Sequence, residues 1–361
     1  MILHYKIQNG RLYVDKGARL RVPELRQLHR LSWEEMLSVV LYLYPKMPDM
    51  EFLLSWGDDC ANGLPVIAPN ACRDLPRAGF TMPSFSVWSQ SFGPVQMASY
   101  HSCIWTRYPA HNRKPLAVWR GSTTGAHHPT TLENYEQIPR FKLHLLTQNH
   151  SDILDAKITR FTSQIPDDVR AKIQLTDRMA PEDYNQYSVI IDVDGNGWSD
   201  RFGNSLIHYT TPVLKMASNR TAFFEHLYAP DTAFVQFNYT LDDLPRKARQ
   251  MVDDIQKLAT QSRYFKMVRN MQATSQMLMD HLGLAEALAE TLLRYRSLAA
   301  WEVAGDDDPL ISDPWDTDSS GFEEVPMTCC TLARVPAEFA TAVTSRLLVK
   351  EATTAGGVHQ E

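Results

Sequence analysis

The stretch "YSVIIDVDGNGWSDRFGNSLIHY", Tyr187–Tyr209, decides the fold class, because it reads as a strand, a glycine-rich turn and the beginning of a helix. Its first residues, "YSVIIDV", form a short β-branched apolar run of the length that a buried strand has. Strand-like and helix-like patterns alternate on both sides of it. This alternation predicts an α/β protein with a parallel sheet that helices cover on both faces.

The turn in this stretch also resembles a calcium loop, since Asp192, Asp194 and Asn196 alternate and Gly197 follows. An EF-hand loop needs a bidentate carboxylate at its twelfth position. Counting from Asp192, that position holds Gly203, and a strand rather than a helix enters the loop. We therefore interpret the turn as an anion-binding loop and expect no metal site.

Apolar periodicity predicts the elements around this stretch. The clearest helix start is in Leu31–Tyr44, where Ser32 and Glu35 would form a capping box that satisfies free backbone amides. Other helices are expected at Ile138–Asn149, from near Ser199, at Thr221–Tyr228 and over most of Thr240–Trp301, with breaks near Gln261 and Gly283. Strands are expected at Met50–Trp56, Pro115–Trp119, Thr211–Met216 and Thr232–Phe237, and a loop over residues 57–84.

Length and composition favour a chain of two domains. With 361 residues, of which 44% are hydrophobic, the chain can bury a substantial core, and a typical domain has about 100–200 residues. We place the domains at residues 1–110 and 111–302, followed by a C-terminal tail at 303–361. The tail contains "GDDDPLISDPWDTDSSGFEE", Gly305–Glu324, whose acidic residues and turn formers indicate a partly irregular segment.

The charge pattern gives no sign of a nucleic-acid or membrane partner. The formal net charge is −6, and Lys and Arg are scattered rather than clustered. No run of about 18 apolar residues occurs, so no transmembrane segment is expected in this chain. "MILHYKIQNG", Met1–Gly10, is too short and polar for the apolar part of a signal peptide. Taken alone, these features predict a cytosolic protein in which any phosphate-binding site is local.

Three N-glycosylation sequons point instead to a secretory lumen. They begin at Asn149, Asn219 and Asn238, although such short patterns also arise by chance. The five Cys residues include no CxxC motif and form no recognisable zinc site. Cys60 and Cys72 could form a disulfide across one loop, or both could be free buried thiols.

Polar residues at the carboxyl ends of three predicted strands form the candidate site, because ligands of open parallel sheets bind there. Asp58 and Asp59 follow the first of these strands. The second strand is followed by Arg120, Gly121, Ser122 and Thr123, and the third by residues 194–201.

An arginine beside glycine and hydroxyl residues is the combination that holds a diphosphate, through forked guanidinium contacts and backbone amides. In the turn, Gly195 and Gly197 would let the backbone approach a ligand, and Ser199 could cap the following helix. The alternative is that Arg120 and Arg201 pair with surface carboxylates while the glycines only form turns. The two aspartates could likewise only cap a helix or close a turn.

Six blocks of the chain resemble glycosyltransferase family 90 in their order and spacing. This family contains the fungal capsule-associated proteins and the Rumi-like protein O-glucosyltransferases. The resemblance runs from about Met1 to Ala300, and the acidic tail lies outside it. The blocks are "MPDMEFLLSWGDD", "MPSFSVW", "PLAVWRGSTTG", "IPRFKLHLL", "YSVIIDVDGNGWSDRFGNSLIHYTTPVLK" and "DDLPRKARQM".

The resemblance implies a GT-B fold, in which two Rossmann-like domains face a cleft, with a helical C-terminal region. Residues 1–110 would be the acceptor-side domain and residues 111–302 the nucleotide-sugar-binding domain. By position, Asp58 matches the catalytic aspartate, and Asp59 is the alternative because "WGDDCANGLP" replaces a more usual Asp-aromatic-Pro sequence. The implied donor-binding residues are Arg120, Gly121, Ser122, Asn196, Gly197, Trp198, Ser199, Asp200 and Arg201, with Arg201 at the diphosphate.

The implied activity is inverting, metal-independent transfer of glucose or xylose from UDP-glucose or UDP-xylose to a protein serine or a glycan hydroxyl. The alternative is a catalytically weak sugar-nucleotide-binding or lectin-like scaffold protein of the same fold. A nicotinamide-dependent oxidoreductase is disfavoured, because no GxGxxG follows a candidate strand and Asp200 stands where close helix packing requires a small residue. The resemblance also implies the lumen of the endoplasmic reticulum or Golgi.

Overall fold

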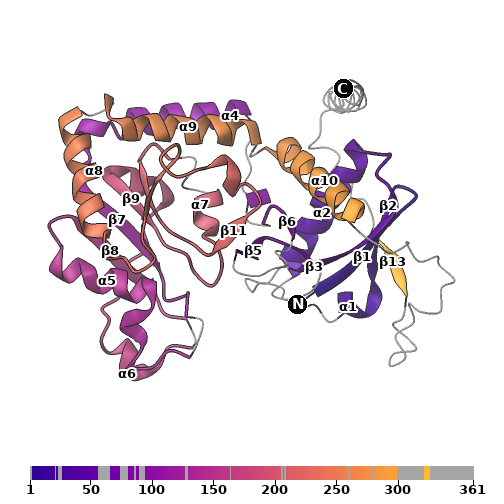
Figure 1. Cartoon of the computed structure of the whole chain (residues 1–361), viewed down its shortest axis with the longest axis horizontal. Coiled ribbons are helices and arrows are strands. Elements are labelled where there is room, and N and C mark those ends of the chain that lie inside the picture. The colour runs from indigo at the N-terminus through magenta and orange to yellow at the C-terminus, as the bar shows by residue number, and fades with distance from the viewer. Residues whose placement is uncertain are drawn as a thin grey trace, which may run out of the picture.

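A computed structural model of the chain describes residues 2–20, 22, 27–55, 66–73, 80–84, 87–88, 94–126, 129–162, 164–204, 206, 209–258, 261–278, 280–298 and 321–325. These residues form two large sheets, one on each side of the molecule, together with helices (Figure 1). The predicted α/β class is confirmed.

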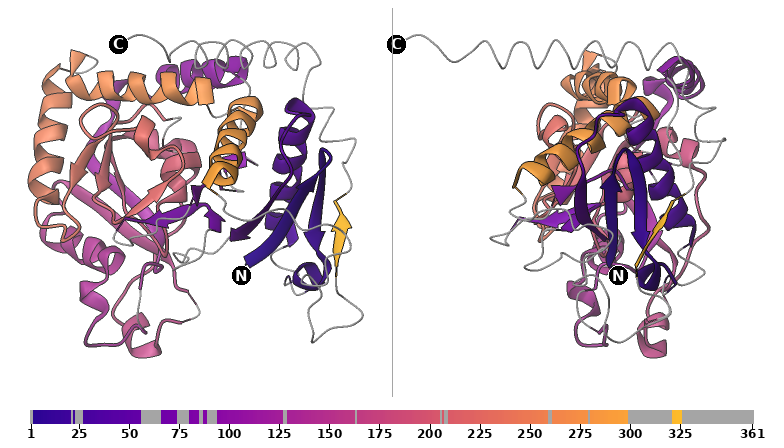
Figure 2. Two further views of the ribbon diagram at one scale, coloured as in Figure 1. Left: turned by 45° about the vertical axis from the view of Figure 1, so that its right-hand side comes forward. Right: turned by 90° about the vertical axis from the view of Figure 1, so that its right-hand side faces the viewer.

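The first sheet combines antiparallel and parallel strands. Its order is β13 (Phe322–Glu324), β2 (Arg11–Asp15), β1 (Ile2–Gln8), β3 (Met50–Ser55), β4 (Val66–Ala68) and β6 (Phe80–Thr81). Strands β3, β4 and β6 run parallel, whereas β13, β2 and β1 are joined antiparallel. Strand β13 comes from the predicted acidic tail and lies at the outer edge of the sheet (Figure 2).

Strands β1 and β2 form a hairpin that was not predicted. Its turn is Asn9-Gly10, with φ angles of 51° and 73°. Positive φ at both central residues matches the twist of the flanking strands, which is why Asn-Gly is the favoured dipeptide for a two-residue hairpin. Alternate residues such as Leu3, Tyr5 and Ile7 are fully buried against the core.

The second sheet is entirely parallel. Its order is β12 (Val235–Phe237), β10 (Val213–Met216), β9 (Tyr187–Asp192), β7 (Lys114–Ser122) and β8 (Leu154–Arg160). This confirms the predicted parallel sheet and four of its strands, while β8 was not predicted. Because the strands are parallel, the carboxyl ends of β7 and β9 lie at one edge of the sheet.

Helices cover both faces of the second sheet, as predicted. Trp119 of β7 packs in one cluster with residues of α5 (Pro139–Asn149) and α8 (Leu244–Leu258). Its neighbour Val118 points to the other face, where it shares a cluster with Phe202 of α7 (Asp200–Asn204). None of the helices in the described part of the chain is long and apolar enough to cross a membrane.

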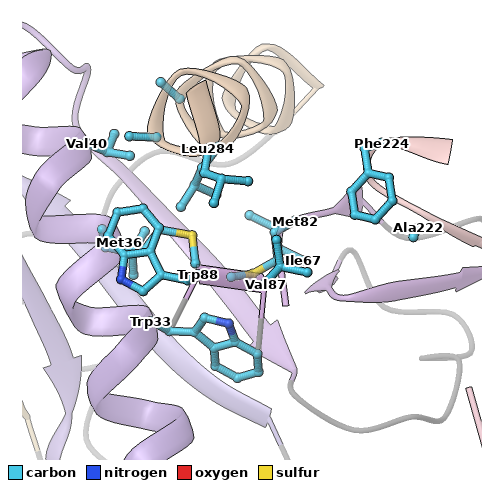
Figure 3. Close-up of a cluster of buried hydrophobic side chains, with 14 of the residues drawn as sticks. Trp33, Met36, Val40, Ile67, Met82, Val87, Trp88, Ala222, Phe224 and Leu284 are labelled. Carbon is cyan, nitrogen blue, oxygen red and sulfur yellow. The ribbon is translucent and has the colours of Figure 1, made fainter. Parts of the chain in front are cut away.

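One hydrophobic cluster connects the two halves of the molecule. It contains Trp33 and Met36 of α2 (Gln27–Leu43) and Leu284 of α10 (His281–Leu298) (Figure 3). Phe224, which lies between β10 and β12 of the second sheet in sequence, belongs to the same cluster. Helix α10 lies within the range predicted for the second domain, yet it packs beside the first sheet.

The remaining elements are short or connect the two halves. Helices α4 (Pro94–Arg107) and α9 (Arg263–Leu278) run side by side along one side of the molecule (Figure 1). Strands β5 (Asn70–Cys72) and β11 (Arg220–Ala222) form a two-stranded antiparallel sheet. Short helical elements are α1 (Lys16–Leu20), α6 (Asp167–Arg170), η2 (Ala110–Asn112), η3 (Tyr135–Gln137), η4 (Pro181–Gln186) and η6 (Glu225–Leu227).

The predicted start of the first helix is wrong. Helix α2 begins at Gln27, so Ser32 lies inside it and cannot cap it. Arg30 and Glu34 form a buried i,i+4 ion pair at 2.7 Å across the expected start, which stabilises the helix there.

Two other predictions need correction, and both concern tertiary contacts. Thr221–Tyr228 is not a helix but β11 followed by η6, because β11 pairs with β5 from the other half. The predicted loop 57–84 contains β4, β5 and β6. Both predicted helix breaks are confirmed, because α8 ends at Leu258 before α9 begins, and α9 ends at Leu278 before α10 begins at His281. Gly283 lies in the first turn of α10, where its amide donates to Oδ1 of the capping Asp280 at 2.6 Å.

Candidate functional site

A cavity of about 410 Å³ lies beside the carboxyl ends of β7 and β8. Four of its lining side chains are arginines, and none of the lining side chains that the structure describes is a carboxylate. Its lining residues are Arg120, Gly121, Ser122, Thr159, Arg160, Arg178, Met179, Pro181, Tyr184, Arg201 and Tyr209.

A second cavity of about 250 Å³ adjoins the first, and Arg201 lines both. The other residues around it are Thr124, Arg140, Gly195, Asn196, Gly197, Trp198, Ser199 and Asp200. The predicted blocks that follow β7 and β9 are therefore brought together. Every predicted donor-binding residue lines one of these two cavities.

A buried lysine holds the turn after β9. Lys215 of β10 lies opposite Asp192 of β9, and its Nζ is 3.0 Å from Asp192 Oδ2 and 3.4 Å from Asp194 Oδ1. Burial alone would lower the pKa of Lys215, but the two carboxylates outweigh it and raise the pKa. Both aspartates of the apparent calcium loop are therefore engaged by an internal cation.

The prediction that Ser199 caps the following helix is wrong, because its side chain does not cap α7. Its hydroxyl donates to Asp192 Oδ1 at 2.6 Å, and its backbone amide donates to Asp194 Oδ1 at 3.0 Å. Helix α7 has only five residues, so its dipole contributes little to anion binding. Positive charge at this site must come from side chains.

The other half of the molecule also contacts the turn. Oδ1 of Asn70, which begins β5, accepts the backbone amide of Trp198 at 3.2 Å, and both residues are buried. The Trp198 ring lies 4.4 Å from Lys215 Nζ and 5.4 Å from the Phe224 ring. The conformation of the turn is therefore fixed from several directions.

Arg140, at the beginning of α5, has a role that was not predicted from the sequence. Its guanidinium donates to the carbonyls of Val193 and Asp194 and to that of Ser122, and it donates to Thr124 Oγ1 at 2.5 Å. It thereby ties the loop after β7 to the turn after β9. Burial lowers the pKa of Arg140 to about 10, with a smaller effect from Arg201, and the group stays charged at neutral pH.

The same arginine explains the glycine of the turn. A Cβ atom on Gly195 would lie 3.0 Å from both Arg140 Nη2 and Thr124 Oγ1, which is too close without a shift. On the side of β7, a Cβ atom on Gly121 would lie 2.4 Å from the Trp119 ring. Both glycines are needed for packing behind the site.

Arg120 lines the first cavity but is held by a carboxylate beneath it. Its Nη2 is 2.8 Å from Asp155 Oδ2, and its Nη1 donates to the carbonyls of Trp119 and Asp155. Tyr187 also donates to Asp155 Oδ2, at 3.0 Å. Burial would raise the pKa of Asp155, but the bonds from Arg120 and Tyr187 lower it. The charge of Arg120 is thus largely balanced inside the protein.

Arg201 differs from Arg120, because its Nη1 is buried and has no hydrogen-bond partner among the described residues. A buried, unpaired guanidinium nitrogen is unfavourable unless a ligand completes it. Asn196 contributes through its side chain, whose Oδ1 accepts the amide of Gly125 at 2.9 Å. Asp200 is exposed at the start of α7.

The predicted catalytic residues Asp58 and Asp59 lie outside the described residues, as does Cys60. Strand β3, which precedes the two aspartates, ends at Ser55. Cys72 is disulfide-bonded, so the alternative that it is a free thiol is wrong. Among the residues that are described, no three His, Cys, Asp or Glu side chains are grouped so that they could hold a metal ion.

Comparison with models of known protein families assigns the chain to a family. The family model described as glycosyl transferase family 90 matches residues 1–282. A search of curated proteins finds no match. The matched range covers more than half of the chain and includes both cavities. The protein therefore belongs to glycosyltransferase family 90 and is a glycosyltransferase.

Proposed function

We propose that this glycosyltransferase inverts the anomeric carbon as it transfers glucose or xylose from a UDP-sugar to a protein serine or a glycan hydroxyl. The observation that carries the proposal is the pair of cavities that share Arg201. We further propose a GT-B arrangement, in which residues 1–110 contribute the acceptor side and residues 111–302 the donor side. The parallel second sheet, with its ligand-sized cavities at the carboxyl ends, supports the donor assignment.

The cavity charge suits a diphosphate. Arg201 presents a guanidinium nitrogen that has no hydrogen-bond partner among the described residues, and the described lining of the larger cavity includes no carboxylate that would repel an anion. Forked guanidinium groups bind phosphate oxygens through two parallel charge-assisted hydrogen bonds. As UDP leaves, negative charge develops on the diphosphate, and a fixed cation stabilises it without reorganisation.

We propose that no metal ion takes part, because side chains supply the charge that a metal would supply. The carboxylates of the turn, Asp192 and Asp194, are bound to Lys215 rather than directed at a ligand. Arg140 and Arg201 both line the smaller cavity, which places fixed positive charge beside the turn. Lys215 and Arg140 act as positioning residues that hold the turn and the loop after β7.

The acceptor needs a base. Serine and sugar hydroxyls are weak nucleophiles at neutral pH, so a carboxylate must take the proton as the hydroxyl oxygen attacks the anomeric carbon opposite UDP. We propose Asp58 for this role, with Asp59 as the alternative. Both follow β3, whose carboxyl end belongs to the parallel part of the first sheet.

A catalytically weak sugar-nucleotide-binding or lectin-like protein is the second candidate. One observation favours it: Arg120, an implied donor-binding residue, is bound to Asp155 instead of being free. Release of UDP during incubation with UDP-glucose or UDP-xylose and a glycan or peptide acceptor distinguishes the two. Turnover supports the transferase, donor binding without turnover supports the second candidate, and the absence of donor binding contradicts both.

We propose the lumen of the endoplasmic reticulum or Golgi as the compartment. Disulfides persist in oxidising compartments, and Cys72 is disulfide-bonded. The asparagines of all three sequons, Asn149, Asn219 and Asn238, are exposed, which N-glycosylation requires.

A further inference from the structure

We propose that Arg160 and Arg178 bind the diphosphate together with Arg201, while Arg120 only supports the cavity from beneath. Arg160 is the last residue of β8, and Arg178 precedes η4. The inference rests on the proposed function, because it assigns further binding residues to the same cavity. It predicts a clamp of three arginines, of which only Arg201 belongs to the loop motifs after β7 and β9.

The first argument is the charge balance of the larger cavity. Of its four arginines, Arg120 is neutralised by Asp155. The guanidinium groups of Arg160, Arg178 and Arg201 form no ion pair with any side chain that the structure describes. Three unpaired cations around about 410 Å³ repel one another, and a bound polyanion would remove that repulsion.

The second argument is that the backbone holds both arginines in place. Arg160 pairs with Ser122 across β7 and β8, and its carbonyl accepts the amide of Thr123 at 3.2 Å. The segment that leads to Arg178 is fixed where the amide of Thr176 donates to the carbonyl of Ile158 at 3.0 Å. Arg160 and Arg178 are both exposed, and both line the cavity.

The third argument concerns the rest of the lining, which suits a nucleoside more than a bare anion. Tyr184 and Tyr209 both line the cavity, and their rings are stacked with centroids 6.2 Å apart. Met179 adds a polarisable apolar side chain. A ligand that combines a flat, partly apolar group with at least two negative charges matches this wall, which is the chemistry of a nucleoside diphosphate.

Measured UDP affinity tests the inference directly. The double variant Arg160→Ala/Arg178→Ala is compared with wild type by titration calorimetry with UDP, UMP and uridine. We expect UDP affinity to fall at least about tenfold, because charge-assisted hydrogen bonds to phosphate are lost. The loss for UMP should be smaller, and uridine affinity should not change. The UDP affinity of the variant should also depend less on salt.

Two control variants distinguish the loss of positive charge in the cavity from a general effect on folding. Arg269→Ala removes an exposed arginine of α9 that does not line the cavity, so UDP affinity should not change. Arg160→Lys/Arg178→Lys keeps the charge and should recover part of the lost affinity. Equal UDP affinity of wild type and the double alanine variant would overturn the inference and leave the proposed function standing. No UDP binding by wild type would overturn both.

Discussion

Substitution of Lys215 by Met should destabilise the protein and abolish its proposed donor site at the same time. Lys215 is 2% exposed, and its ammonium is the only positive group that the described contacts place within 3.5 Å of Asp192 and Asp194. Methionine fills a similar volume and leaves the two buried carboxylates without their ion-pair partner. Removal of one partner from a buried ion pair typically costs about 3–5 kcal/mol.

The second effect of Lys215→Met follows from the position of the same carboxylates. Asp192 and Asp194 accept the hydroxyl and the amide of Ser199, so their repulsion would displace the turn that lines the smaller cavity. Chemical denaturation should show the loss in unfolding free energy, and UDP titration should show the loss of affinity. Asp192→Asn in the same chain removes one of the two charges and should restore part of the stability.

Lys142→Met is the matched control. Lys142 of α5 lies at the surface, 3.4 Å from the exposed Asp242, and such pairs contribute about 0–1 kcal/mol. If Lys215→Met costs no more than Lys142→Met, or if it binds UDP as wild type does, the internal ion pair does not hold the turn. The reasoning about Lys215 would then be refuted.

Three further predictions concern other residues of the account. Asp58→Asn should reduce transfer at least about a hundredfold and leave UDP affinity nearly unchanged, because it removes only basicity; full turnover in both Asp58→Asn and Asp59→Asn would mean that neither is the base. The pKa of Asp155 is lower in the folded protein than its unfolded value of 3.8, so its ionised form stabilises the fold above pH 3.8. This stability is lost as the pH falls through the folded pKa, and Asp155→Asn should therefore make the unfolding free energy depend less on pH in acid. An unchanged dependence would contradict this. A chain made in the secretory pathway should lose mass on endoglycosidase treatment if Asn149, Asn219 or Asn238 is glycosylated, and substitution of each by Gln should show which of them carries a glycan. No change in mass would contradict glycosylation at these three residues.

The parallel sheet and the residues at and after the ends of β7 and β9 that line the two cavities could be predicted because their signals are local. β-branched runs such as Tyr187–Asp192 are buried on both faces, and the residues that follow this strand include Gly195, Gly197 and Arg201. The hairpin could have been predicted as well, since Asn9-Gly10 between alternating apolar residues is a strong turn signal.

The rest depended on contacts between distant parts of the chain. Strand β11 forms only because β5, about 150 residues earlier, offers it a partner, and no local pattern shows this. Arg140 reads in sequence as one basic residue of a helix, and its four hydrogen bonds appear only when β7 and β9 lie side by side. The side chain of Ser199 was assigned to a helix cap, but the nearby Asp192 is a stronger, charged acceptor.

Titration of wild type and Arg201→Ala with UDP in the presence of a chelator tests the central claim most directly. The account predicts that wild type binds UDP without a metal ion, and that Arg201→Ala binds it more weakly by about 1.5–3 kcal/mol while remaining folded. Binding only after manganese or calcium is added, or equal affinity of a folded Arg201→Ala variant, would contradict it.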